Sequence, residues 1–210
     1  WLDQSGNNNT ATAPSTGKEP TIYTGGAIVK ENRRVALDVN DKVLNTSSSI
    51  TLPTDLTMFY VTKKDDTGTG GSVLAKGNNA RYAEGYAGKG LPTLGDNNGS
   101  QFIVNENLNN NFDMNLAAYQ KLIYTNRRGT TGACAINGSA EKTATATLTS
   151  SVTFDSITGN GGGYHSYDGI VQEAIFYADD KSGTDRTSIE ENIGDYFTQN
   201  TPLLDTYSGA

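Results

Sequence analysis

Short runs of apolar residues, rich in β-branched and aromatic side chains, recur along this chain between clusters of turn residues. Runs of this kind occupy residues 21–23, 27–29, 35–39, 56–62, 72–76, 101–104, 116–124, 133–136, 142–148, 152–154 and 170–177. Most of them are too short for a helix of three turns, and glycine, asparagine and proline stand between them. Many short strands at this spacing predict two antiparallel sheets packed face to face.

Residues 56–62, with the sequence LTMFYVT, give the strongest strand signal in the first half of the chain. Nearly every position is apolar or aromatic, so this run predicts a strand that is buried on both faces. Residues 47–54 are interpreted as a polar approach to this strand. Residues 78–98 contain four glycines and are predicted to be irregular.

Three turns are predicted from residues that adopt turn conformations at little cost. Asn137-Gly138 indicates a tight hairpin turn, and Tyr167-Asp168-Gly169 indicates a second turn of the hairpin type. Residues 31–33 predict a turn between the runs at 27–29 and 35–39. The pairs Arg33-Arg34 and Arg127-Arg128 are expected to be solvated turn residues.

One short helix is predicted near the C-terminal end of the sequence, at about residues 188–199. Thr187 and Glu190 have the spacing of a capping box, in which each side chain bonds the backbone N–H of the other residue. Ile189, Ile193 and Tyr196-Phe197 then fall on one helical face. The predicted fold class is therefore all-β, a two-sheet antiparallel jelly-roll sandwich with this one C-terminal helix.

Residues 1–210 are expected to form a single domain, because all-β sandwiches often run to 200 residues or more. The sequence starts at Trp1 and not at Met, so the domain is expected to be part of a longer chain. The one cysteine, Cys134, lies in a strand-like run and is interpreted as a small buried hydrophobe.

The charge of the chain excludes one large class of partners. The formal net charge is −7, whereas a surface that binds nucleic acid must be basic. No apolar run approaches the roughly 20 residues that cross a bilayer, so no membrane insertion is expected. Charged residues make up only 19% of the chain, which is common among proteins of virions and microbial exteriors. The expected location is a virion surface or the extracellular space.

Several motifs resemble those of concanavalin A-like, laminin-G-like jelly rolls. Residues 167–177, YDGIVQEAIFY, are similar to the final strands of that fold, and residues 185–197 are similar to the helix that follows in many phage and marine-bacterial members. Residues 134–138, CAING, resemble the family's central hairpin. The opening WLDQSGN, residues 1–7, is similar to the start of such phage proteins and of the catalytic module of fungal-type arabinofuranosidases.

This resemblance implies the sandwich fold but not an activity, because lectins, glucanases, adhesins and structural domains all use it. Retaining glycosidases need two carboxyl groups about 5–5.5 Å apart, as on alternate positions of one strand. Glu173 has no acidic residue at position 171 or 175, and the pairs at 65–66, 179–180 and 190–191 are adjacent in sequence. No catalytic residue is therefore predicted, and Glu173 is interpreted as a structural carboxylate.

The resemblance also implies that calcium could be a cofactor. Asp3, Ser5 and Asn7 alternate in a loop with Gly6, and Asp168 stands beside Gly169 and the glycine-rich residues 159–163. Oxygen ligands on a loop of this kind suit calcium. The alternative is that each acid forms an Asx-turn with its own backbone.

Aromatic and amide-rich loops suggest a glycan site. Sugars are held by aromatic faces with polar groups around them, and the candidates are Tyr82, Tyr86, Tyr164, His165 and Tyr167. The alternative is that these rings meet a neighbouring subunit, because aromatic residues are enriched at protein interfaces.

The predicted function is a non-catalytic surface module, a virion decoration or fibre domain that adheres to cell-surface or capsule glycans or to neighbouring coat subunits. Such subunits include further copies of this chain, in a homo-oligomer. The alternatives are a glycoside hydrolase of the same fold, similar to an arabinofuranosidase or a laminarinase, and a calcium-dependent lectin domain of a bacterial adhesin.

Overall fold

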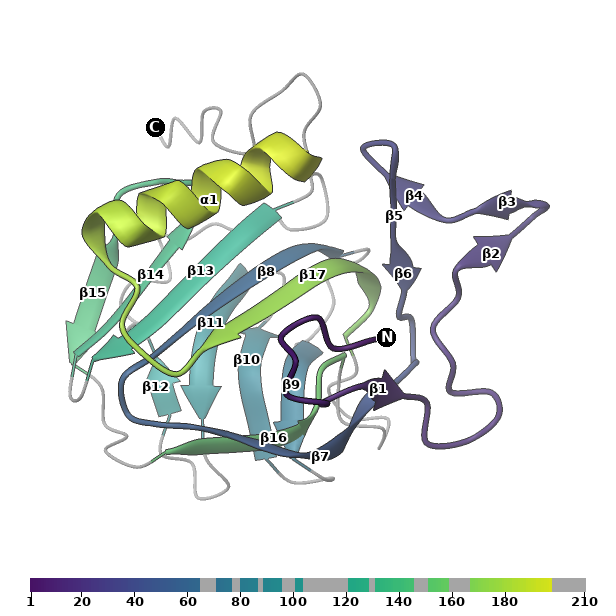
Figure 1. The fold of residues 1–210 in the computed structure, drawn as a ribbon, viewed down its shortest axis with the longest axis horizontal. Coiled ribbons are helices and arrows are strands. Elements are labelled where there is room, and N and C mark those ends of the chain that lie inside the picture. The colour runs from purple at the N-terminus through teal and green to yellow at the C-terminus, as the bar shows by residue number, and fades with distance from the viewer. Residues whose placement is uncertain are drawn as a thin grey trace.

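A computed structural model describes residues 1–64, 71–76, 80–86, 89–95, 101–103, 121–128, 131–145, 151–158 and 167–197. In these residues the strands form two large sheets, every strand pair of which is antiparallel. The two sheets face each other, and one helix lies on the outer side of the second sheet (Figure 1). The prediction of an antiparallel β-sandwich with one C-terminal helix is confirmed.

The first sheet has seven strands in the order β1-β7-β16-β9-β10-β11-β12. Their bounds are β1 Ala11–Thr12, β7 Asn45–Leu52, β9 Gly71–Lys76, β10 Ala80–Tyr86, β11 Lys89–Gly95, β12 Gln101–Ile103 and β16 Val152–Ser156. The second sheet has six strands in the order β15-β14-β13-β8-β17-β6. Their bounds are β6 Leu37–Asp38, β8 Leu56–Lys64, β13 Lys121–Arg128, β14 Thr131–Ile136, β15 Lys142–Thr145 and β17 Gly169–Tyr177.

Four strands differ from the sequence prediction. The polar segment before β8 is itself strand β7, and the glycine-containing residues 78–98 supply strands β10 and β11. Strand β13 includes Arg127 and Arg128, which are therefore not turn residues, and residues 116–120 of the predicted run lie outside the described part of the chain. Strand β7 runs between β1 and β16 with its middle residues exposed, so backbone pairing stabilises it where apolar periodicity is absent.

Four short strands form an arm, defined here as residues 22–35, that projects from the sandwich on the right of Figure 1. These strands are β2 Tyr23–Thr24, β3 Ala27–Ile28, β4 Lys30–Glu31 and β5 Arg34–Val35. Strand β2 pairs with β3, and β4 pairs with β5. Asn32 and Arg33 have φ values of 45° and 64°, which confirms the turn predicted at residues 31–33.

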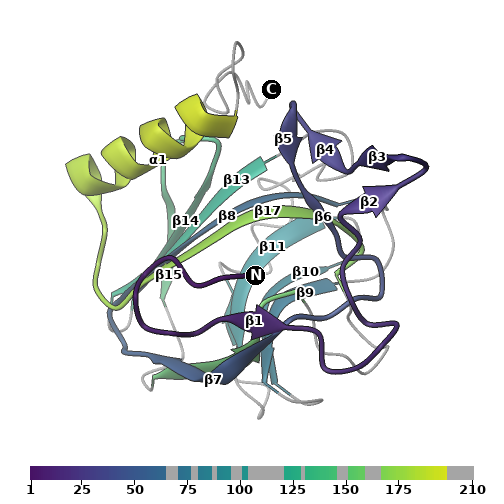
Figure 2. The ribbon, with the colours of Figure 1, turned by 45° about the vertical axis from the view of Figure 1, so that its right-hand side comes forward.

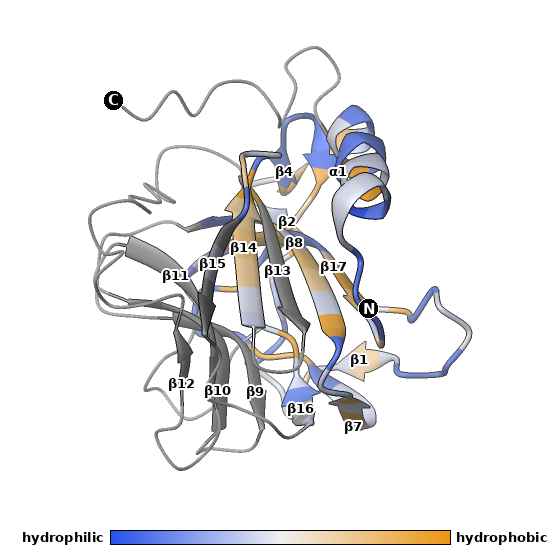
Figure 3. Ribbon diagram, turned by 90° about the vertical axis from the view of Figure 1, so that its left-hand side faces the viewer, coloured by the Kyte–Doolittle hydropathy of each residue, from blue (hydrophilic) through white to orange (hydrophobic). Residues whose placement is uncertain are grey.

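The central strand β8 is buried on both faces, as its sequence predicted. Toward the seven-stranded sheet, the Tyr60 ring lies 5.7 Å from Phe176, which in turn lies 5.0 Å from Phe154 on β16. Toward the helix, Phe59 and Val61 are fully buried. The second face is closed by helix α1, Gly183–Phe197, whose apolar side turns to the sheet (Figure 3).

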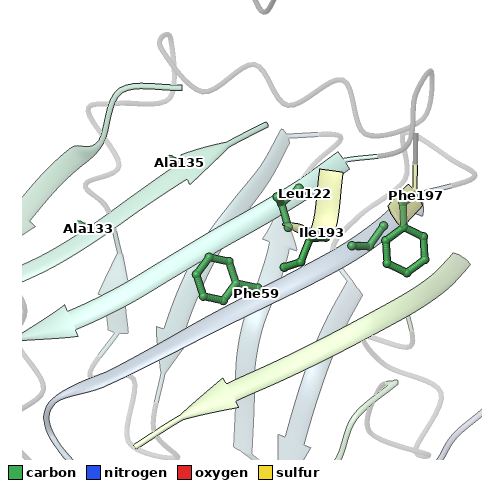
Figure 4. Packing of buried hydrophobic residues seen from close by; sticks show 7 residues of the cluster. Phe59, Leu122, Ala133, Ala135, Ile193 and Phe197 are labelled. Carbon is green, nitrogen blue, oxygen red and sulfur yellow. The ribbon is translucent and has the colours of Figure 1, made fainter. Parts of the chain in front are cut away.

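The core beneath α1 joins the helix to four strands. Its buried members are Phe59, Val61, Leu122, Ala133, Ala135, Ile193 and Phe197, and the partly buried Ile175 and Tyr177 of β17 pack against them. Figure 4 shows Leu122 and Ile193 side by side, with Phe59 and Phe197 on either side of them. The two alanines on β14 leave room above the sheet, which allows the helix to approach closely.

Helix α1 begins five residues earlier than predicted, so Thr187 is an internal residue and not a cap. Its hydroxyl donates to the Gly183 carbonyl oxygen, 3.1 Å away, within the helix. The capping-box prediction is therefore wrong. Glu190 instead forms an ion pair with Arg186 one turn earlier, at 3.1 Å. None of the described helices is long and apolar enough to cross a membrane.

The two predicted hairpin turns have different outcomes. Asn137 and Gly138 have φ values of 49° and 72°, as a turn of this kind requires, and Asn137 Oδ1 accepts the Leu122 N–H at 2.8 Å. The second prediction is wrong, because Gly169 is the first residue of β17 and Tyr167 is buried. The Cys134 side chain is fully buried, which confirms its interpretation as a core residue.

Two buried tyrosines, each 2% exposed, differ in how their hydroxyl groups are satisfied. The Tyr167 and Thr62 hydroxyl oxygens lie 2.6 Å apart, and Thr62 Oγ1 is also 2.8 Å from the Ile170 carbonyl oxygen. Because Thr62 carries one proton, which the carbonyl can only accept, Tyr167 donates to Thr62. The Tyr60 hydroxyl has no hydrogen-bond partner among the described residues, and burial raises its pKa well above 10.

Substituting each of these tyrosines by phenylalanine is therefore expected to have opposite effects. Tyr60→Phe removes an unpaired buried hydroxyl and should raise the free energy of unfolding by about 1 kcal/mol, whereas Tyr167→Phe should lower it by about 1 kcal/mol. Urea unfolding of the two variants and of the wild type measures both changes in the free energy of unfolding. Equal losses in the two variants would contradict the assignment of the Tyr60 hydroxyl as unpaired.

Candidate functional site

An open groove lies at one side of the sandwich, between β1 and β6, the edge strands of the two sheets. Figure 2 shows this side, with the N-terminal residues in front of the sheets and the arm beside them. The groove has a volume of about 620 Å³, within the range of small-molecule sites. The residues that line it are Trp1, Ala11, Thr12, Ala13, Glu19, Pro20, Ile22, Val35, Ala36, Leu37, Leu44, Val171 and Gln172.

The floor of the groove is part of the sandwich interior. Ala11, Ala36, Leu44 and Val171 are all buried, and two of the four are alanines. Small side chains on a floor allow a ligand to come close to the backbone beneath. The two walls, by contrast, carry large side chains that remain exposed, among them Trp1 at 36% and Val35 at 58%.

Trp1 is held in place by its backbone. Its N atom donates to the Ala11 carbonyl oxygen at 2.7 Å, and the Ala11 N–H donates back to the Trp1 carbonyl oxygen at 2.9 Å. The segment between them is closed by Asp3, whose two carboxylate oxygens accept the N–H groups of Ser5 at 2.7 Å and Asn9 at 2.8 Å. The indole is thus presented on a loop with fixed ends, which lowers the entropy lost when a ligand binds to it.

The opposite wall is fixed to the sandwich by Gln172, the buried residue at the bulge in β17. Gln172 Nε2 lies 3.2–3.3 Å from the carbonyl oxygens of Glu31, Arg34 and Val35. The two protons of this one side-chain amide are therefore shared among three backbone carbonyls of the β4–β5 hairpin, with one of the bonds bifurcated. The arm is thus attached to β17 beside the groove.

Two further contacts hold the same hairpin. Lys63 Nζ lies 3.2 Å from a Glu31 carboxylate oxygen. Arg34 Nε donates to the Tyr196 carbonyl oxygen at 2.7 Å, and its guanidinium lies 4.1 Å from the centre of the Tyr196 ring. Arg34 was predicted to be solvated in a turn, and this prediction is wrong, because a cation is attracted to both an aromatic face and a helix C-terminus.

The predicted calcium ligands of the first loop already have hydrogen-bond partners. Besides the two bonds to Asp3, the Ser5 hydroxyl oxygen accepts from Asn7 Nδ2 at 3.0 Å. Hydrogen bonding from the Ser5 side chain, and then from the backbone N–H of Asn9, lowers the pKa of Asp3. This geometry is the Asx-turn alternative, in which backbone N–H groups take the carboxylate oxygens.

The other predicted calcium ligand lies elsewhere. Asp168 Oδ1 accepts the Asp41 N–H at 3.3 Å, and the glycine-rich residues beside it fall outside the described part of the chain. Within the described residues, no three or more His, Cys, Asp or Glu side chains are grouped so that they could hold a metal ion. Calcium binding therefore stays a prediction.

The five predicted sugar-binding side chains are not brought together by the described structure. Tyr82 and Tyr86 belong to strand β10, opposite Leu94 and Lys89 of β11, and their side chains lie outside the description. Tyr164 and His165 are not among the described residues. Tyr167 is buried with its hydroxyl bonded to Thr62, so the structure places it in the interior and away from any surface that stacks on a sugar.

Glu173 lies half-buried on β17, opposite Val61 of β8. Burial raises the pKa of its carboxyl group, and a hydrogen bond from the Ala174 backbone opposes this shift. The backbone bond agrees with the prediction of a structural carboxylate. Glu173 does not line the edge groove.

The groove itself was missed by the sequence analysis. Trp1, Val35 and Gln172 are far apart in the chain and meet only because β1 and β6 are the edges of facing sheets. The one usable signal was the opening WLDQSGN motif, which contains the single tryptophan of the chain.

Comparison with known proteins supports the fold. No family model matches the chain, and no curated protein matches it by sequence. Among solved structures, the chain is similar to domain 4 of AbnA, a GH43 extracellular arabinanase from Geobacillus stearothermophilus, determined in complex with arabinotriose. The TM-score is 0.59 and the identity 14%, over 83% of this chain and 85% of that chain. This likeness shows a shared β-sandwich fold.

Proposed function

We propose that this protein is a non-catalytic carbohydrate-binding module that works outside the cell. The observation that carries the proposal is the structural likeness, over most of both chains, to a domain of an extracellular arabinanase determined with arabinotriose. The edge groove adds a place of suitable size, with an exposed aromatic ring on one wall. Because a single site of this kind binds a short sugar weakly, several copies or an attached partner domain would supply avidity.

The proposal is tested by a glycan array followed by calorimetry with arabinotriose and with other neutral oligosaccharides. We expect saturable binding to at least one plant, capsule or cell-surface glycan, with a dissociation constant between about 10 µM and 1 mM. Absence of binding to every glycan, in the presence and in the absence of calcium, would overturn the proposal.

The same samples separate the two alternatives of the same fold. Hydrolysis of arabinan or a β-glucan that is lost in Glu173→Gln would identify a glycoside hydrolase, because a half-buried carboxyl group with a raised pKa suits a general acid. Binding that disappears with a chelator and in Asp3→Ala would identify a calcium-dependent lectin. Binding that survives both, without turnover, is the result expected of the non-catalytic module.

A second candidate is contact with neighbouring copies of the chain, and the arm is the observation that favours it. Ile22, Tyr23, Ile28 and Val35 are 50–61% exposed. Exposed apolar side chains gathered on one element are typical of interaction surfaces. A virion decoration or fibre module would use the arm in this way. Light scattering across a hundredfold range of concentration, with Tyr23→Ser as the variant, tests it, and a monomer throughout would count against it.

A further inference from the structure

We infer that the edge groove is the carbohydrate site, that Trp1 is the ring on which the sugar stacks, and that the preferred ligand is a neutral oligosaccharide. This inference rests on the proposed function and goes beyond it, because it assigns the site and the ligand class. The likeness to the arabinanase domain does not assign either of them for this chain.

The first argument is the position of the indole. Trp1 is the single tryptophan of the chain, lies on the groove wall and is 36% exposed. The C–H face of a sugar ring is apolar and packs on the face of an aromatic ring, and an indole offers the largest such face. The two backbone bonds with Ala11 fix the residue without using the side chain, so the ring is available to a ligand.

The second argument is the combination of lining groups. The wall residues Ile22, Val35 and Leu37 and the buried floor are apolar, while Thr12 and Glu19 are polar and exposed. A groove of about 620 Å³ with an apolar surface and few polar groups suits a ligand that has apolar faces and hydroxyl edges. A short oligosaccharide has both, and the groove is open, so a longer chain could pass through it.

The third argument is charge. Among the described residues that line the groove, Glu19 is the one with a charged side chain, and none is a lysine or an arginine. The chain as a whole carries a formal net charge of −7. A uronate or sialate ligand would meet the Glu19 carboxylate and no lysine or arginine side chain of the described lining, so anionic sugars are disfavoured relative to neutral ones.

The experiment uses the single tryptophan as its own reporter. Calorimetry and tryptophan fluorescence are measured together during titration with arabinotriose, with any neutral oligosaccharide found on the array, and with trigalacturonate as the anionic probe. We expect the neutral sugar to shift Trp1 emission to shorter wavelength and to reduce its acrylamide quenching about twofold or more, because the ligand covers the ring. Trigalacturonate is expected to bind at least about tenfold more weakly.

Variants test the residue assignment. Trp1→Ala should lower the affinity for the neutral sugar about tenfold or more, because aromatic anchors dominate sites of this kind. The matched control is Leu2→Ala, which removes an exposed apolar side chain that is next to Trp1 in the sequence but does not line the groove, and should leave the affinity unchanged. Val35→Lys places a cation on the opposite wall, so the affinity for trigalacturonate should move closer to the affinity for the neutral sugar. Thermal unfolding curves confirm that each variant is folded.

The outcomes separate the site from the function. If a sugar binds but Trp1 fluorescence is unaffected and Trp1→Ala binds equally well, the inference about the groove is wrong and the proposed function stands. If trigalacturonate binds more tightly than the neutral sugars, the assignment of ligand class is wrong. If no sugar binds at all, the proposed function fails, and the inference fails with it.

Discussion

Replacing Phe59 with alanine should lower the free energy of unfolding by about 3–5 kcal/mol. Phe59 is fully buried in the core beneath α1, between strand β8 and the helix, and its ring lies 6.1 Å edge-on from Tyr177. Truncation removes these contacts and leaves a cavity. Strand β8 cannot move to close it, because it is paired with β13 on one side and with β17 on the other. Urea unfolding followed by far-ultraviolet circular dichroism measures the loss.

Two other substitutions make the Phe59 result specific. Phe59→Leu keeps most of the apolar volume and should lower the free energy of unfolding by less than Phe59→Ala does. Ile28→Ala removes a side chain of similar chemistry from the arm, where it is 50% exposed, and should change stability by less than about 0.5 kcal/mol. A Phe59→Ala loss no larger than that of Ile28→Ala would show that the face of the sheet beneath α1 is not closely packed.

Replacing Arg186 with methionine should lower the free energy of unfolding by about 3–5 kcal/mol, because it leaves the buried Glu190 carboxylate without its counter-charge. Arg186 lies 3.1 Å from Glu190 and 3.6 Å from Glu141, and its Nη2 donates to the Ser139 carbonyl oxygen at 2.6 Å. The Glu190 side chain is 3% exposed and the Arg186 side chain 10%. This cluster attaches the first half of α1 to the segment between β14 and β15.

The pH dependence of this loss follows from Glu190. Burial raises the pKa of Glu190 above its usual 4.5, although Arg186 opposes the shift. A raised pKa in the folded state means that stability falls as pH rises from 4.5 through the folded pKa. Without Arg186 the opposing effect is gone, so the loss in Arg186→Met should be larger at pH 7 than at pH 4.5, where the carboxyl group can take up a proton.

Two comparisons identify the buried charge as the cause. The double variant Arg186→Met with Glu190→Leu replaces the ion pair by apolar side chains and should recover most of the lost stability. Lys181→Ala breaks an ion pair with Asp179, whose side chain is 59% exposed, and should leave stability nearly unchanged. A pH-independent loss, or a double variant as unstable as Arg186→Met, would contradict the role assigned to Glu190.

The sequence predicted the elements whose apolar pattern is local. The run at 56–62 predicted a doubly buried strand, and every residue from Leu56 to Thr62 was found to be buried. Asn137-Gly138 predicted its turn because only a few residue types accept positive φ there. Strand β7 and strands β10 and β11 were missed, because serine, threonine and glycine leave the choice between strand and loop to pairing with neighbours.

Side-chain roles that depend on distant residues could not be predicted. The helix signal at Thr187 and Glu190 was interpreted as a local cap, whereas Glu190 pairs with Arg186 beneath the helix. Tyr167 looked like an exposed loop aromatic, and its hydroxyl was found bonded to Thr62, 105 residues away. In both cases the local pattern was compatible with an exposed and with a buried position. The packing of distant elements then placed the residue in the interior.

By itself, the sequence determined that this chain builds antiparallel strands and one C-terminal helix, because strand, turn and helix propensities act between residues that are close in the chain. Tertiary structure decided which strands became sheet edges, and so where the edge groove opens. Trp1, Val35 and Gln172 become neighbours only after the two sheets have paired and packed, since no local interaction brings residues so far apart together.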